Sequence, residues 1–174
     1  MKKLLVVVDM QNDFITGALG SEDAKKIVSY VGKKIESYRK NGHRVLFTRD
    51  THFDNYLSTQ EGKNLPVPHC IKGTEGHLIT DELNVGDSEV FDKPAFGSIR
   101  LAERIAKFAK ECGIIELCGL CTDICVVSNA LILKAKLPET KIVVDAKACA
   151  GITEKSHNAS LLTMKMCQVE VLND

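Results

Sequence analysis

Residues 4–9 read LLVVVD, an apolar run that stops at a carboxylate. The apolar part, Leu4 to Val8, is too short for the apolar segment of a secretory signal peptide and for a membrane span. Its content of β-branched residues is typical of a buried strand. We therefore predict an interior β-strand here, with Asp9 at its carboxyl end.

Five further apolar runs follow this one, and stretches with helical periodicity lie between most of them. The runs are RVLFTRD (44–50), SEVFDK (88–93), IIELCGL (114–120), KIVVDA (141–146) and QVEVL (168–172). The helical patterns cover 21–41, 98–112, the stretch from Thr122-Asp123 to Pro138, and about 153–166. Alternating strands and helices with continuous apolar strands predict a parallel sheet covered by helices on both faces.

Composition narrows the class of protein. The chain has 174 residues, which predicts a single domain over 1–174. Lys plus Arg and Asp plus Glu number 23 each, so no basic field for nucleic acid or for a membrane surface is expected. The seven cysteines form no even, loop-rich framework, and Cys112, Cys118, Cys149 and Cys167 fall within apolar patterns. These features predict a reduced, cytoplasmic protein.

Groups able to do chemistry stand at four consecutive strand ends. They are Asp9, the pair Asp50 and His52, Lys93, and the segment Cys118–Cys125. Ligands of open α/β sheets bind at the carboxyl ends of the strands, so these groups are expected to converge. The irregular stretch 51–87 holds three of the five histidines, which favours a functional loop. His77 and His157 receive no role, and His43 is expected to be solvated in a turn.

The segment CGLCTDICVV (118–127) holds three cysteines, and three interpretations compete for it. A helix capped by Thr122 or Asp123 would place Cys125 in its first turn, where free N–H groups and the helix dipole lower a thiol pKa. Cys118 and Cys121 have the spacing of a zinc knuckle, but no second such pair follows. The same spacing occurs in redox motifs, in which the helix opens at the first cysteine. Position favours Cys125 as a nucleophile.

A nucleophilic thiol needs a base, and Asp9 is the candidate. Burial would raise the pKa of the Asp9 carboxyl, and a nearby Lys93 would restrain the rise. The carboxylate could then take the thiol proton and return it to a leaving amine. Each residue also has an ordinary alternative, because Asp9 could be a cap and Lys93 a solvated charge.

Three motifs, DMQNDF (9–14), DKPAFGS (92–98) and CGLCTDICV (118–126), resemble those of the isochorismatase-like cysteine hydrolases. The resemblance runs in order over nearly the whole chain. It implies a three-layer αβα fold with a six-stranded, mostly parallel sheet, and catalytic Asp9, Lys93 and Cys125. It also implies a cis peptide between Leu120 and Cys121, and an oxyanion hole made by the N–H groups of Cys121 and Cys125. Cys121 stands where the family commonly has a small residue.

The loop resembles the nicotinamidase branch, whose members hold a metal that binds the pyridine nitrogen. Asp50, His52 and His69 match that branch directly, and Glu61 resembles the glutamate of one set of nicotinamidases, in place of a third histidine. Alone, these residues could be scattered loop polars. The resemblance implies one divalent transition metal, with zinc expected and manganese or iron as alternatives.

The resemblance also implies a substrate pocket and an activity. Phe14 is similar to the family aromatic that packs on the pyridine ring, although core packing is an equal alternative. The other expected pocket residues are Leu19, Leu65, Leu120 and Cys121. The expected reaction is hydrolysis of nicotinamide, and also pyrazinamide, in NAD salvage. The alternatives are another small-amide hydrolase, an isochorismatase, or a non-catalytic thiol or metal sensor. A homo-oligomer is compatible with the sequence.

Overall fold

The computed structural model describes residues 2–174, which form a sheet in the strand order β3-β2-β1-β4-β5-β6. The strands are β1 (Lys2–Val8), β2 (Arg44–Asp50), β3 (Val90–Lys93), β4 (Cys112–Leu120), β5 (Lys141–Ala150) and β6 (Glu170–Leu172). Every neighbouring pair is parallel. The six-stranded sheet is therefore confirmed, and it is wholly rather than mostly parallel.

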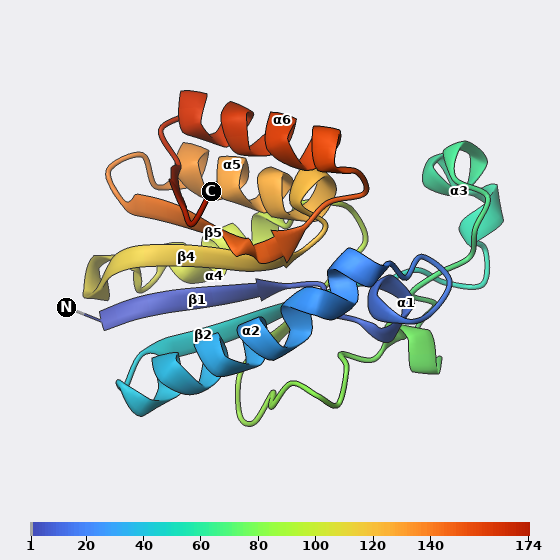
Figure 1. Cartoon of the computed structure of the whole chain (residues 1–174), viewed down its shortest axis with the longest axis horizontal. Coiled ribbons are helices and arrows are strands. Elements are labelled where there is room, and N and C mark those ends of the chain that lie inside the picture. The colour runs from blue at the N-terminus through green and yellow to red at the C-terminus, as the bar shows by residue number, and fades with distance from the viewer. Residues whose placement is uncertain (1) are drawn as a thin grey trace.

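Helices cover both faces of the sheet, which confirms the three layers (Figure 1). They are α1 (Asn12–Ile15), α2 (Glu22–Lys40), α3 (Gln60–Asn64), α4 (Ile99–Ala106), α5 (Val127–Lys136) and α6 (Glu154–Met166). The connection from β1 to β2 runs in one direction across the sheet, and those into β4, β5 and β6 run in the other. Because such crossovers are right-handed, α2 lies on one face and α4, α5 and α6 lie on the opposite face.

The direction of the connections reverses between β1 and β4. The chain moves from β1 outward to β2 and β3, then returns to place β4 on the other side of β1. A crevice for ligands forms at the carboxyl ends of the strands where the order reverses. Gly119, near the end of β4, has φ +115°, and a Cβ there would lie 2.1 Å from the carbonyl oxygen of Val8. Only glycine therefore lets these two strand ends approach so closely.

Several expected boundaries differ from the observed ones. The helix expected over 98–112 ends at Ala106, a 3₁₀ turn follows at Ala109–Glu111, and β4 already begins at Cys112. The stretch 51–87 contains 3₁₀ turns and α3, which stands away from the body of the molecule (Figure 1). Cys167 is exposed, because it follows the last turn of α6 instead of facing the core. His43, expected to be solvated, is only partly exposed, since its ring packs edge-on against Tyr38.

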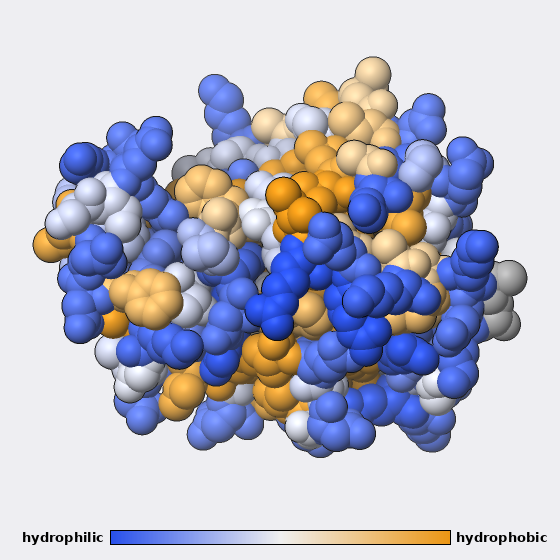
Figure 2. Space-filling view, turned by 180° about the vertical axis from the view of Figure 1, so that it is seen from behind, coloured by the Kyte–Doolittle hydropathy of each residue, from blue (hydrophilic) through white to orange (hydrophobic). Residues whose placement is uncertain are grey.

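The face opposite to that of Figure 1 mixes apolar and charged surface (Figure 2). Phe96 and Ile99, near the start of α4, are among the exposed large apolar side chains. The possible homo-oligomer remains a prediction. No helix within residues 2–174 combines the length and the apolar character needed to cross a bilayer.

Candidate active site

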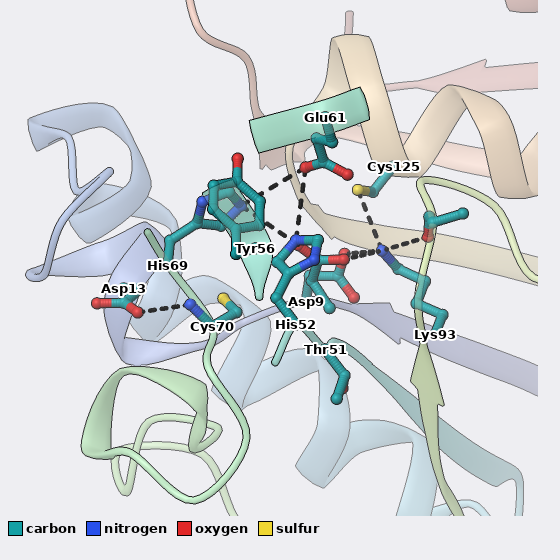
Figure 3. Close-up of polar contacts among 12 residues, drawn as sticks. Asp9, Asp13, Thr51, His52, Tyr56, Glu61, His69, Cys70, Lys93 and Cys125 are labelled. Carbon is teal, nitrogen blue, oxygen red and sulfur yellow. Dashed lines mark hydrogen bonds and ion pairs between the residues drawn. The ribbon is translucent and has the colours of Figure 1, made fainter. Parts of the chain in front are cut away.

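Asp9, Lys93 and Cys125 meet in the buried interior although they come from three separate segments (Figure 3). Asp9 follows β1, Lys93 ends β3, and Cys125 lies in the turn after β4. The Lys93 ammonium is 2.6 Å from Asp9 Oδ2 and 3.3 Å from Cys125 Sγ. It also donates to the carbonyl oxygen of Ala95 at 3.1 Å. The structure therefore brings together the three residues of the expected catalytic set.

The two carboxylate oxygens of Asp9 have different surroundings. Thr48 donates its hydroxyl to Oδ1 at 2.6 Å, and Asp9 itself adopts a left-handed backbone with φ +47°. Apart from its ion pair with Lys93, Oδ2 is buried without a hydrogen-bond donor among residues 2–174. One oxygen is thus fixed by Thr48, and the other, ion-paired with Lys93, is the one that can accept a proton.

Burial shifts the pKa values of both Asp9 and Cys125. Burial raises the pKa of Asp9, and Lys93 opposes the rise, as the sequence predicted. Burial and then the charge of Asp9 raise the pKa of the Cys125 thiol well above its ordinary value, although Lys93 lowers it. The predicted lowering of this pKa is therefore wrong, because the loss of solvent outweighs the position in the first turn. The resting thiol holds its proton and needs a base.

The turn that carries Cys125 is held by α6 and by the segment just before it. Thr122–Val126 form a π-helical turn that continues directly into α5. Neither Thr122 nor Asp123 caps this turn, so the predicted cap is wrong. Thr122 bonds instead to His157 Nδ1 at 2.8 Å, and Asp123 accepts from the backbone N–H of Ile152 at 3.0 Å. His157, for which no role was predicted, therefore fastens this turn.

The peptide between Leu120 and Cys121 is cis, as the resemblance implied. Asn129, in α5, links the motif at 92–98 to the motif at 118–126. Its Nδ2 donates to the carbonyl oxygen of Cys125 at 2.8 Å, and its Oδ1 accepts from the backbone N–H of Ser98 at 3.0 Å. Asn129 lies outside the three motifs and was not singled out from the sequence.

A second cluster, from here on the four-ligand cluster, consists of Asp50, His52, Glu61 and His69, and one ligand atom of each lies within 4.8 Å of the others. His52 Nε2 is 3.0 Å from Asp50 Oδ2 and 3.4 Å from Glu61 Oε1. His69 Nε2 is 3.5 Å from the same oxygen of Asp50. Two imidazoles and two carboxylates that converge on one point fit a divalent transition metal ion.

Residues of the first motif hold this cluster from outside. Gln11 donates Nε2 to the carbonyl oxygen of Asp50 at 2.9 Å and accepts from the N–H of Asp50 at 2.7 Å. Asp13 accepts from the N–H of Cys70, the residue after His69, at 2.7 Å (Figure 3). His69 Nδ1 lies 2.7 Å from the carbonyl oxygen of Val67, which leaves Nε2 for a metal. Gln11 and Asp13 belong to the same motif as Asp9, DMQNDF (9–14), and that shared motif is the signal that could have found them.

The expected pocket residues are placed unevenly. The Phe14 ring lies 5.6 Å from the His69 ring between centroids, beside the cluster. Leu120 is buried directly before Cys121, whereas the side chain of Leu65 is 39% exposed and Leu19 packs against the core. Phe14 and Leu120 thus lie next to the two clusters, and pocket roles for Leu19 and Leu65 remain predictions.

Comparison with known proteins identifies the family of this chain and several relatives. The model of the isochorismatase domain family matches residues 3–173. This chain belongs to that family. A nicotinamidase/pyrazinamidase of Mycobacterium tuberculosis is 26% identical over 98% of each chain. A protein of Arabidopsis thaliana named as a probable inactive nicotinamidase is 31% identical over 92% of this chain and 87% of its own.

Solved structures of family members share the fold. The pyrazinamidase of Pyrococcus horikoshii in complex with zinc has a TM-score of 0.86 and 26% identity, with 100% of both chains covered. Since a relative that is 31% identical is named as a probable inactive nicotinamidase, membership alone does not assign an activity. An activity for this chain must therefore be argued from the residues at the site.

Proposed function

We propose that this protein is a nicotinamidase that hydrolyses nicotinamide to nicotinic acid and ammonia, with pyrazinamide as a second substrate. Relatives with this activity support the reaction class. The observation that carries the proposal is the contact between two clusters. Lys93, beside the thiol, is 3.4 Å from Asp50 of the four-ligand cluster. A nucleophile and a candidate metal centre therefore share one site, as a substrate with an amide and a ring nitrogen requires.

Acylation begins with the transfer of the thiol proton of Cys125 to Asp9 Oδ2, the oxygen that is ion-paired with Lys93 and does not accept from Thr48. The thiolate attacks the amide carbon, and the N–H groups of Cys121 and Cys125 receive the oxyanion. Loss of one such donor typically costs about a hundredfold or more in rate. Asp9 then protonates the leaving nitrogen, the C–N bond breaks, and ammonia departs from a thioester on Cys125.

Deacylation uses the same carboxylate. Asp9 accepts a proton from water as the water attacks the thioester carbon. The C–S bond breaks, nicotinic acid is released, and the proton returns to Cys125. Throughout, the Lys93 ammonium stabilises the ionised Asp9 at 2.6 Å and keeps it against the thiol.

Asp50, His52, Glu61 and His69 would hold the metal, for which zinc is the proposed identity. The zinc-bound pyrazinamidase supports that choice, as does the mixture of imidazole and carboxylate donors. When bound, the ion would supply a Lewis acid that takes the ring nitrogen of the substrate as a ligand. Phe14, beside His69, would pack on the ring.

Benzamide tests this assignment, because it has the amide and the ring but lacks the ring nitrogen. We expect ammonia release from nicotinamide and pyrazinamide, and kcat/KM for benzamide lower by on the order of a hundredfold or more. Equal turnover of nicotinamide and benzamide would remove the ring nitrogen from recognition. Turnover of a different small amide alone would keep the hydrolase and replace the substrate.

An inactive family member is the second candidate function, because the Arabidopsis relative carries that description. A protein that only binds metal or senses thiol oxidation would release no ammonia from any amide. The buried contact of Asp9, Lys93 and Cys125 favours the enzyme, since three polar groups are costly to bury without a use.

A further inference from the structure

Tyr56 packs against the four-ligand cluster, although it is not one of the four proposed ligands. Its side chain is 1% exposed. Its ring centroid is 4.7 Å from that of His52 and 5.1 Å from that of His69, and the two imidazoles are 4.8 Å apart. Three rings therefore pack against one another at steep angles, so the Tyr56 ring contacts both imidazoles (Figure 3).

The two ends of Tyr56 fasten the segment that carries Glu61. Its hydroxyl donates to the carbonyl oxygen of Leu65 at 2.8 Å, directly after α3. Its own carbonyl oxygen accepts the hydroxyl of Thr59 at 2.7 Å, directly before α3. Gly62 packs so tightly on that carbonyl that a Cβ would lie 2.1 Å from the oxygen.

Alternative anchors for Glu61 are scarce. The five residues of α3 stand apart from the sheet and its covering helices, with the 3₁₀ turn Tyr56–Ser58 beside them (Figure 1). Leu57, the next side chain along the chain, is 54% exposed and so offers little packing. The position of the Glu61 carboxylate over His52 and His69 thus depends on the links made through Tyr56.

We propose that Tyr56 is the positioning residue of the four-ligand cluster: its ring sets the planes of His52 and His69, and its hydroxyl and carbonyl hold Glu61 over them. This inference rests on the proposed function only in taking that cluster as the metal centre. Its test therefore reads the binding of Co²⁺ to purified, metal-stripped protein without substrate.

The variants are Tyr56→Leu, which removes ring and hydroxyl, and Tyr56→Phe, which removes only the hydroxyl. Phe53→Leu is the matched control, since Phe53 lies in the same loop but is 55% exposed. We expect Tyr56→Leu to weaken Co²⁺ binding by about 10–100-fold, as loss of a residue that orients ligands usually does, and to change the visible Co²⁺ spectrum. Tyr56→Phe should weaken binding less and should speed amide exchange in residues 61–67. Phe53→Leu should change none of these.

A double-mutant cycle with Glu61→Gln separates positioning from general loosening. Because Tyr56 acts through Glu61, Tyr56→Phe should weaken Co²⁺ binding further by less than twofold once Glu61→Gln is present. Wild-type Co²⁺ affinity and spectrum in Tyr56→Leu would overturn the inference about Tyr56. That result would not contradict the proposed nicotinamidase activity, which is tested separately by ammonia release. If Tyr56→Leu does not fold, Tyr56→Phe decides, and wild-type affinity together with wild-type exchange in that variant would overturn it.

Discussion

Lys93 Nζ lies 3.4 Å from Asp50 Oδ1, while the other oxygen of Asp50 lies 3.0 Å from His52 Nε2. One buried carboxylate therefore faces the ammonium beside the thiol and the imidazole of the four-ligand cluster at the same time. Lys93 also compensates the charge of Asp9. Burial alone would lower the pKa of Lys93, but the charge of Asp9, with further contributions from Cys125 and Asp50, raises it, so Lys93 remains charged.

Replacing Lys93 by methionine should lower both the stability of the protein and its turnover of nicotinamide. The variant leaves two buried carboxylates without their cation, which costs about 3–5 kcal/mol of unfolding free energy when one partner of a buried pair is lost. We expect kcat for nicotinamide to fall by about 10²–10⁴-fold, the usual contribution of a proton-transfer group whose state is lost. Lys33→Met, at an exposed site of α2, is the control, and denaturant unfolding with steady-state rates measures both effects. Turnover within threefold of wild type would contradict the role of Lys93.

The sequence predicted what depends on local pattern and residue type. Apolar runs such as Leu4 to Val8 gave the strands, and strand ends gave Asp9, Asp50 and Lys93. Predictions from the sequence were wrong where segments that are distant in the chain contact each other. Thr122 and Asp123 have the residue types of a cap, but their partners are instead His157 of α6 and the backbone N–H of Ile152, just before α6. Tyr56 looks like any loop aromatic until the rings of His52 and His69 are placed against it.

Asp9→Asn should change thiol reactivity and turnover in opposite directions. The negative charge of Asp9 raises the pKa of the Cys125 thiol, so its neutral isostere should lower that pKa and move alkylation of Cys125 to lower pH. Turnover should nevertheless fall by about 10²–10⁴-fold, because no base remains. Mass spectrometry of iodoacetamide-treated protein follows Cys125 against the exposed Cys167. An unchanged alkylation profile would show that Asp9 does not act on the thiol.

Glu61→Gln tests the fourth ligand. The carboxylate lies 3.4 Å from His52 Nε2, and its loss removes one charged donor from the cluster. We expect zinc affinity to fall by about 10–100-fold, which lowers the melting temperature at limiting zinc, because ligand binding adds to stability by mass action. Glu75→Gln, at an exposed site of the same long loop, should leave affinity unchanged. Equal zinc titrations for the two variants would remove Glu61 from the metal centre.

His77 should make stability fall in mild acid. Burial and then the charge of Arg49 lower the pKa of His77, whose Nε2 lies 2.8 Å from the hydroxyl of Thr51. The unfolded chain then binds more protons than the folded one, so the contribution of His77 is complete above about pH 6.5 and is lost as the pH falls below it. His77→Gln should therefore show a weaker decline in unfolding free energy between neutral pH and about pH 5. Parallel curves for the two proteins would contradict this.

Ammonia release from nicotinamide tests the central claim most directly. The comparison includes zinc-loaded wild type, the same protein after chelation, Cys125→Ala, and Cys167→Ala as an exposed thiol control. We predict turnover in wild type and Cys167→Ala, none in Cys125→Ala, and recovery of the chelated protein when zinc is restored. Turnover in Cys125→Ala, or no turnover in zinc-loaded wild type, would contradict the assignment of this site as a cysteine-dependent nicotinamidase.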